Sequence, residues 1–293
     1  MLKIPQPQQE YNNQGVALEQ HPPNNRTNSL SSQNVGIKFL QTSNKTLVET
    51  KIQVSLESLV KLDDNTVKNI LYEMANSNLS IENSSIENFA LITSKHFFRE
   101  FDNINLVKLD VEQSNWQQIE NNKAGHFQAE CLRFVRLADP RNGEISLCSG
   151  VKSLSVPKKS EVSEFLKSNS IKMDVFWKIS SSGIEEHTRS LVNDRQSVID
   201  FNETYDKVRE SIWNGVKDIQ NIDLKDQCNN VLGDVPIIKC VFISIPNCGQ
   251  KMDAFASRHQ SVTQQFSFHG RPANNIFLNH FHRMNRDFYA SKL

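Results

Sequence analysis

Apolar and polar residues alternate along several stretches of the chain, which is typical of strands that bury one face against a core. The clearest stretch is residues 45–56, where Val48, Ile52 and Val54 fall on the same side. Such a strand is half buried, so its sheet needs a covering layer on one face. The other predicted strands start near Val35 and Phe127 and cover 107–111, 145–155, 173–179 and 237–245.

Elsewhere apolar residues recur at intervals of three and four, which predicts helices with one buried stripe. Asp64 or Asn65 can cap the first helix, because a short polar side chain accepts hydrogen bonds from the free N–H groups of the first turn. Ser84-Ser85-Ile86-Glu87 has the pattern of a capping box for the second helix. The predicted helices cover 65–75, a stretch from 86 onward, 201–219 and 224–232.

The order of these elements predicts the fold class. Two strands, two helices and two strands are followed by a second series in a similar order, which favours an α+β fold with antiparallel sheets and helices on one face. We therefore predict two tandem halves, at 34–146 and 147–293. Residues 1–33 are rich in Asn, Gln, Pro and Ser and are predicted to be a disordered tail.

Composition excludes several classes of function. Lys plus Arg and Asp plus Glu both number 33, so no excess charge favours nucleic acid or an anionic membrane. No apolar run is long enough to span a bilayer, and the N-terminus lacks a secretory signal. The five cysteines include no C-x-x-C pair, which is typical of reduced thiols rather than a disulfide framework. Cys131 and Cys240 lie in apolar stretches and are predicted core residues.

Histidines and basic residues near the C-terminus do not form a recognisable site. His280 and His282 have no carboxylate at ligand spacing, so surface histidines are the better interpretation and no metal is expected. Arg283 and Arg286 lie among aromatic residues, but the balanced charge favours a packed segment over a nucleic-acid patch. His96 is interpreted as a half-buried helical histidine.

Seven ordered sequence blocks resemble the urate oxidase family. Together they cover roughly two-thirds of the chain, and their order is more specific than any single block. The blocks lie at Leu62–Asn69, His96–Phe98, Val107–Trp116, His126–Ala129, Ser149–Leu154, Trp213–Ile219 and Ile243–Asn247.

This resemblance implies the tunnelling fold (T-fold), in which each half is an antiparallel sheet with two helices on one face. It also implies a homotetramer whose subunits join sheet edge to sheet edge, with active sites between subunits. The activity implied is oxidation of urate by dioxygen to 5-hydroxyisourate in purine catabolism, without a cofactor.

The resemblance also places the family's first set of site residues, several of them altered. Asp64 falls on the catalytic Thr, and Asn65 falls on the Asp beside it, where it would contact substrate. The catalytic Lys falls nearest Asn34, and Lys38 is only a distant substitute. A carboxylate at position 64 would repel an anionic ligand unless it were protonated.

The second set of site residues comes from the later blocks. Val162 falls on the Phe that stacks on the purine, and an aliphatic side chain cannot stack in that way. Gln220 or Asn221 falls on the Gln that reads the purine edge. Asn247 matches the Asn that holds dioxygen, Gly249 replaces a His, and the substrate-binding Arg has no counterpart.

Three hypotheses follow from these matches and departures. The chain is a divergent urate oxidase, or it is an inactive homologue with a structural or regulatory role. A third reading, another purine- or pterin-binding enzyme of this fold, lacks a convincing ligand set. Ser291-Lys292-Leu293 at the C-terminus predicts recognition by the peroxisomal import receptor and a peroxisomal location.

Overall fold

The backbone forms one antiparallel sheet of nine strands, in which each strand pairs with its neighbour in sequence. The computed structural model describes residues 30–42, 46–80, 85–118, 127–157, 170–193, 198–215, 223–246, 251–258 and 260–268. The strands are β1 (Ser31–Thr42), β2 (Thr46–Ser58), β3 (Ile104–Gln118), β4 (Phe127–Pro140), β5 (Ser146–Pro157), β6 (Ser170–Ile179), β7 (Ile238–Ile245), β8 (Lys251–Ser257) and β9 (Gln260–Phe268).

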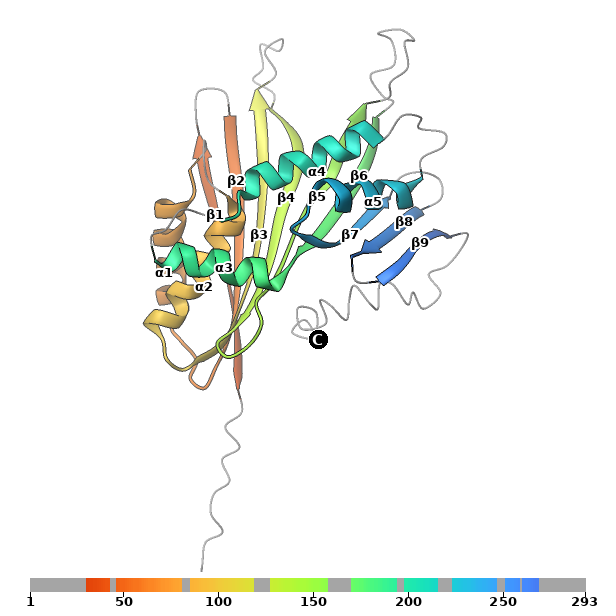
Figure 1. Cartoon of the computed structure of the whole chain (residues 1–293). Helices are drawn as coiled ribbons and strands as arrows, with labels where there is room; N and C mark the ends of the chain where they lie inside the picture. Colours follow the sequence, from red (N-terminus) through yellow and green to blue (C-terminus); the bar gives the residue numbers. More distant parts are fainter. Residues whose placement is uncertain are drawn as a thin grey trace, which may run out of the picture.

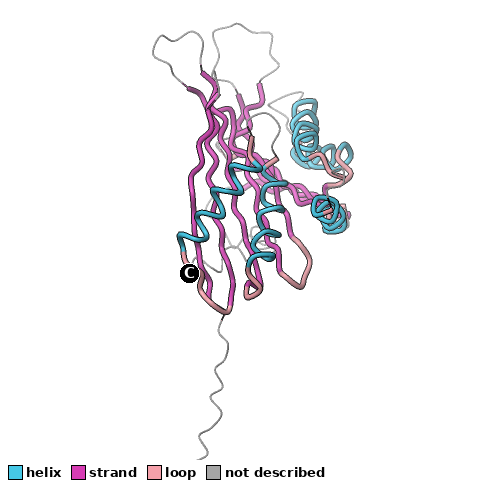
Figure 2. The backbone as a smooth tube through the Cα atoms, turned by 90° about the vertical axis from the view of Figure 1, so that its left-hand side faces the viewer, coloured by secondary structure: helices cyan, strands magenta, loops and turns pink. Residues whose placement is uncertain are grey.

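The described helices all pack on the same face of the sheet, as Figures 1 and 2 show. The register explains this, because the buried residues of adjacent strands lie opposite one another. Ile52 pairs with Val111, and Val111 pairs with Val135, so one continuous apolar face faces the helices. The helices are α1 (Asp64–Asn78), α2 (Ile86–Glu100), α3 (Ser181–Val192), α4 (Phe201–Gly215) and α5 (Leu224–Asp234). The predicted α+β class is confirmed.

The helix starts differ slightly from the prediction. Asp63, rather than Asp64 or Asn65, caps α1, and its carboxylate accepts from the N–H of Thr66 at 2.9 Å. Ser85 caps α2 by accepting from the N–H of Asn88. Since Asp63 is the residue with extended backbone, only its side chain can fold back over the first turn.

The structure contains three elements that the pattern did not predict: α3, β8 and β9. Only Ile184, His187 and Thr188 of α3 are buried, so its apolar stripe is too short to be distinguished from a loop. The structure also starts β1 at Ser31, so residues 31–33 pair with β2 rather than belonging to the tail. In the described part of the chain, no helix has the length and hydropathy needed to cross a membrane.

Two arginines close the C-terminal ends of two helices in the same way. Arg141, just after β4, donates to the carbonyls of Phe98, Phe101 and Ile104 at the end of α2. Arg258, just after β8, donates to the equivalent carbonyls at the end of α5. These carbonyls belong to Leu232, Val235 and Ile238. In each helix the three acceptors are the C-cap residue, the residue three positions before it and the residue three positions after it.

Arg133 of β4 joins the helices of the two parts of the sheet. Its guanidinium donates to Glu87 of α2 at 3.4 Å and to Asn202 of α4 at 3.1 Å. It also lies 4.2 Å from the ring centroid of Tyr205. Because Glu87 is buried, this ion pair fixes α2 and α4 to the same strand.

Candidate functional site

Asp64, the predicted catalytic residue of the first half, lies in the first turn of α1 and is exposed. Its Oδ1 accepts a hydrogen bond of 2.5 Å from the side-chain amide of Gln33 on β1. The same amide donates to the carbonyl of Leu62 at 2.9 Å, and its oxygen accepts from the N–H of Leu62 at 3.1 Å. The carboxylate is therefore part of a clamp that holds the β2–α1 connection onto the edge strand. Asn65 beside it is exposed.

The lysine considered as a substitute lies on the other side of the sheet. Ile37 and Ile52 face the helices, so Lys38 faces the uncovered side. There its ammonium lies 2.9 Å from Glu49, and that hydrogen bond holds the pKa of Glu49 below its usual value. In the described residues, Asp64 has no ion pair with a lysine. The β1–β2 region and α1 thus provide a carboxylate and an ammonium ion, but the sheet separates the two groups.

The other predicted site residues lie outside the described residues, as does the tripeptide that was predicted to be a targeting signal. They are Val162, Gln220, Asn221, Asn247, Ser291, Lys292 and Leu293. The elements that border them are described: β5 ends at Pro157, α4 ends at Gly215 and β7 ends at Ile245.

A bulge in β5 lies just before the segment that contains Val162. The register with β6 shifts between Val151 and Leu154, and Ser153 adopts a positive φ of 58°. Non-glycine residues rarely adopt this conformation, and here the N–H of Ser153 donates to Asp174 at 2.8 Å. The bulge lies within the block at 149–154 that resembles the urate oxidase family. The sequence alone did not predict this bulge.

A row of phenylalanines crosses the sheet face opposite the described helices. Phe134, Gly150, Phe176, Phe242 and Phe255 are successive cross-strand partners from β4 to β8. The rings of Phe134 and Phe176 are 5.0 Å apart, and those of Phe176 and Phe242 are 5.8 Å apart. A Cβ on Gly150 would lie 2.3 Å from the ring of Phe134, so glycine is required there. The sequence pattern gave no sign of this row.

The buried thiols are not suited to nucleophilic chemistry. Burial raises the pKa of Cys148 to about 12, and burial also raises the pKa of Cys228 and Cys240. Cys240 is a core residue as predicted, whereas Cys131 is only half buried and contacts the hydroxyl of Tyr205 at 3.2 Å. A thiol held protonated is a weak nucleophile. Among the described residues, no three side chains of the metal-ligating types gather into one group.

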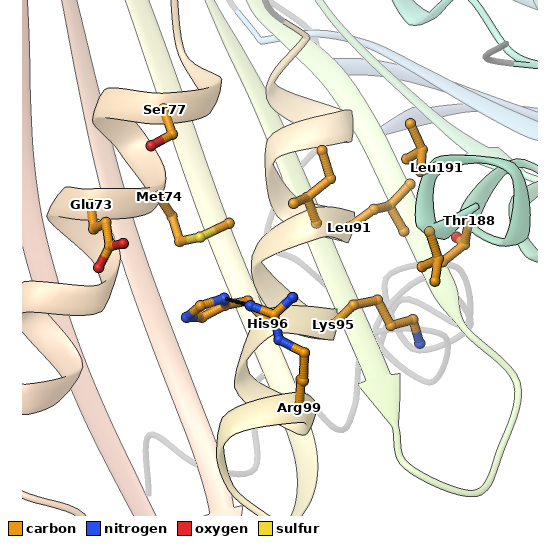
Figure 3. Close-up of a pocket in the computed structure, with 11 residues that line it drawn as sticks. Glu73, Met74, Ser77, Leu91, Lys95, His96, Arg99, Thr188 and Leu191 are labelled. Atoms are coloured by element: carbon orange, nitrogen blue, oxygen red, sulfur yellow. Dashed lines mark hydrogen bonds between the residues drawn. The ribbon is translucent and has the colours of Figure 1, made fainter. Parts of the chain in front are cut away.

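A groove of about 770 Å³ lies on the helical side, far from the sheet face just described (Figure 3). The outer face of α2 forms its floor, and α1 and α3 form its walls. Aliphatic side chains line much of it: Met74, Leu91, Ile92, Leu191 and Val192.

The polar side chains of the groove lie mostly on the second half of α2. Arg99 donates to Nδ1 of His96 at 2.9 Å, so that ring nitrogen carries no proton. Lys95 lies 2.8 Å from the fully buried carboxylate of Asp139. Thr188 of α3 is buried, and its hydroxyl has no hydrogen-bond partner within the described part of the chain. Residue 96 was predicted to be a satisfied helical histidine, and its contact with Arg99 agrees with this.

Asp64 and the end of β7 lie in different regions of the sheet. Asp64 is held by β1, and Asn247 follows β7, six strands away in the order β1 to β9. Strands lie about 4.8 Å apart, so the separation along the sheet is about 29 Å. The end of β7, which precedes Asn247 in the chain, is therefore not adjacent to Asp64 in the sheet.

The chain is similar to uricases in part of its sequence and in its fold. No family model matches the chain. It is 31% identical to a uricase from Danio rerio over 101 residues, which are 33% of this chain and 33% of that uricase, so it matches about a third of the length of this curated relative. The crystal structure of uricase from Arthrobacter globiformis superposes with a TM-score of 0.53 at 15% identity, over 86% of this chain and 98% of that one. A hyper-thermostable AgUricase mutant gives a TM-score of 0.50 at 15% identity, over 85% and 96%.

Proposed function

We propose that this chain, which is related to the urate oxidases in sequence and fold, is a homologue that keeps the fold and does not oxidise urate. The observation that carries the proposal is the state of Asp64. Its carboxylate is held by the amide of Gln33, and the lysine nearest in sequence to the family's catalytic position is paired with Glu49 on the opposite sheet face. The role that remains is structural or regulatory.

Oxidation of urate without a cofactor requires removal of a proton and binding of an anion. The family's relay of Lys and Thr performs the proton transfer, which requires both groups within hydrogen-bond distance of each other or of substrate. Here the ammonium of Lys38 and the carboxylate of Asp64 are on different faces of β1. A fixed negative charge at position 64 also repels a urate anion, and no Arg fork replaces the missing one in the described residues near Asp64.

We further propose that the chain is built of two tandem T-fold halves. The first contains β1 to β4 with α1 and α2, and the second contains β5 to β8 with α4 and α5. The arginine clamps support this division, since Arg141 and Arg258 follow the last of these strands in each half and contact carbonyls at identical offsets.

The assembly proposed is a homo-oligomer formed through the sheet edges, a tetramer by analogy with the family. The separation of β1 and β7 supports more than one copy, because only a neighbouring chain could bring its second half beside Asp64. Import through the receptor that reads Ser291-Lys292-Leu293 would place this assembly in the peroxisome.

The first experiment measures urate consumption by the purified full-length protein, using ultraviolet absorbance with peroxide detected in parallel. Circular dichroism and sedimentation confirm that the sample is folded. We expect the rate to equal the uncatalysed background, while a known uricase assayed alongside consumes urate and releases peroxide. Turnover well above background would refute the proposal.

Urate oxidation by dioxygen through a rebuilt site is the second candidate function. The exposure of Asp64 favours it, because a carboxylate open to solvent in the first turn of a helix could accept a proton from a substrate held by a neighbouring copy. In that case Asp64→Asn should abolish turnover, and Asp102→Asn in an exposed turn should leave it unchanged. A background rate for the unmodified protein excludes this candidate directly.

A further inference from the structure

We propose that the groove between α1, α2 and α3 binds a small molecule that joins an apolar body to a single carboxylate. The groove lies on the helical side, so the proposal does not depend on the presence or absence of urate chemistry. Its shape and its hydrogen-bond donors support this class of ligand.

The size and lining of the groove suit the apolar body. Its volume of about 770 Å³ lies within the range of about 300–1,000 Å³ that is usual for sites that bind small ligands. Leu91 of α2 is fully buried beneath it, whereas Val192 of α3 is 65% exposed at its border. An aliphatic ligand would cover Val192 and remove that apolar surface from water, which is favourable.

Hydrogen-bond donors at one end of the groove suit the carboxylate. Arg99 has donors beyond those it directs to His96 and Glu100, and its side chain is 72% exposed. Because Nδ1 of His96 accepts from Arg99, the proton of that ring is on Nε2, which can donate to a ligand. Figure 3 shows both side chains together on α2, with Lys95 beside them.

Fixed carboxylates around these donors favour a ligand with one negative charge over a ligand with two. The ammonium of Lys95 is already neutralised by Asp139, at 3.1 and 2.8 Å from its two oxygens. Glu73 on α1 adds another carboxylate to the opposite wall. A phosphate monoester would carry close to two charges into this balanced environment, so a monocarboxylate is the better match.

Thr188 borders the groove on the α3 side. Its side chain lines the groove and is 6% exposed, and its Oγ1 has no hydrogen-bond partner in the described chain. A buried hydroxyl without a partner destabilises the free protein. Less than 1 Å² of this oxygen is accessible, so a ligand in the groove does not reach it.

Calorimetric titration of the full-length protein with decanoate, below its micelle concentration, tests the proposal. We expect saturable binding of one decanoate per chain with a Kd of about 100 µM or tighter, an ordinary affinity for about a dozen heavy atoms. Decanol, which lacks the charge, and decyl phosphate, which has an additional one, should each bind more weakly. Equal or tighter binding of decyl phosphate would overturn the choice of a monocarboxylate.

One variant, Arg99→Gln, tests whether decanoate binds at this end of the groove. Arg99→Gln should weaken decanoate binding about three- to tenfold, a moderate effect because the side chain is exposed. Thr188→Val should leave decanoate binding within about twofold, because the hydroxyl is out of the ligand's reach, and should raise the melting temperature of the free protein, because it removes an unsatisfied buried hydroxyl. Arg189→Gln, an exposed position on α3 outside the lining, is the matched control.

Several outcomes would overturn the proposal. They are an absence of saturable binding up to about 1 mM, roughly ten times the expected Kd, and binding that Arg99→Gln does not change. Binding that Arg189→Gln reduces as much as Arg99→Gln does would show charge attraction without a site. Because each variant's melting temperature is measured alongside, loss of folding is distinguished from loss of binding.

Discussion

At the scale of single residues, His187 shows how burial fixes a protonation state. It is fully buried, its Nδ1 accepts from the N–H of Ile199 at 3.0 Å, and its Nε2 lies 2.7 Å from the side-chain oxygen of Asn88. An amide oxygen only accepts, so Nε2 is the donor and the ring is neutral. Desolvation lowers the pKa of His187 in the folded protein.

This lowered pKa predicts a loss of stability in acid. The unfolded chain takes up a proton on this histidine as the pH falls through about 6.5, whereas the folded protein does so only at a lower pH. The stability that the neutral His187 contributes is therefore complete above about pH 6.5. It is lost as the pH falls from there toward the pKa of His187 in the folded protein. Free energies of unfolding from urea titrations at pH 7.5 and 5.0 measure the difference.

His187→Gln is the variant that isolates this effect. At pH 7.5 it should cost about 1–3 kcal/mol, because two buried hydrogen bonds are disturbed. Between pH 7.5 and 5.0 it should lose less stability than the unmodified protein does. An equal loss in both proteins would assign the acid sensitivity to other groups.

At the scale of elements, the sequence predicted the regular parts because their burial is regular. The strand at 45–56 and the helix start at Ile86 follow from alternation and capping alone. The sequence did not predict α3, because few residues of that helix are buried. A single sequence also does not predict contacts between distant elements. The clamp of Gln33 on Asp64 and the phenylalanine row both depend on the register across strands, which a single sequence does not reveal.

The two arginine clamps give a prediction at the same scale. Arg141→Lys and Arg258→Lys should each cost about 1–3 kcal/mol of stability, because one ammonium cannot reach three carbonyls at a helix end. Thermal unfolding followed by circular dichroism measures this. Arg189→Lys is the control and should change stability by no more than about 0.5 kcal/mol. A large cost at one clamp and none at the other would argue against two equivalent halves.

At the scale of the whole molecule, the sheet leaves two edge strands, β1 and β9, without a described partner on one side. Edge strands with exposed backbone groups tend to pair with other chains. Exposed apolar residues gather at one end of the β1–β2 pair, where Ser31 lies opposite Ser58. They are Leu30, Leu59 and Val60, each at least half exposed. This edge is therefore the best candidate for contact between copies.

The prediction is that this edge holds the oligomer together. Native mass spectrometry should give a multiple of the 33.5 kDa chain, and the double variant Leu30→Lys, Val60→Lys should need at least about tenfold more protein to associate, since two charges would be buried at the contact. Val198→Lys is the control, because Val198 is 52% exposed and lies outside the β1 edge. This variant should associate like the unmodified protein. A monomeric unmodified protein, or a double variant that associates as readily, would contradict this role. A monomeric protein would also have no neighbouring copy to bring its second half beside Asp64. A site that combines Asp64 with the second half requires that copy, because about 29 Å of sheet separates the two parts within one chain.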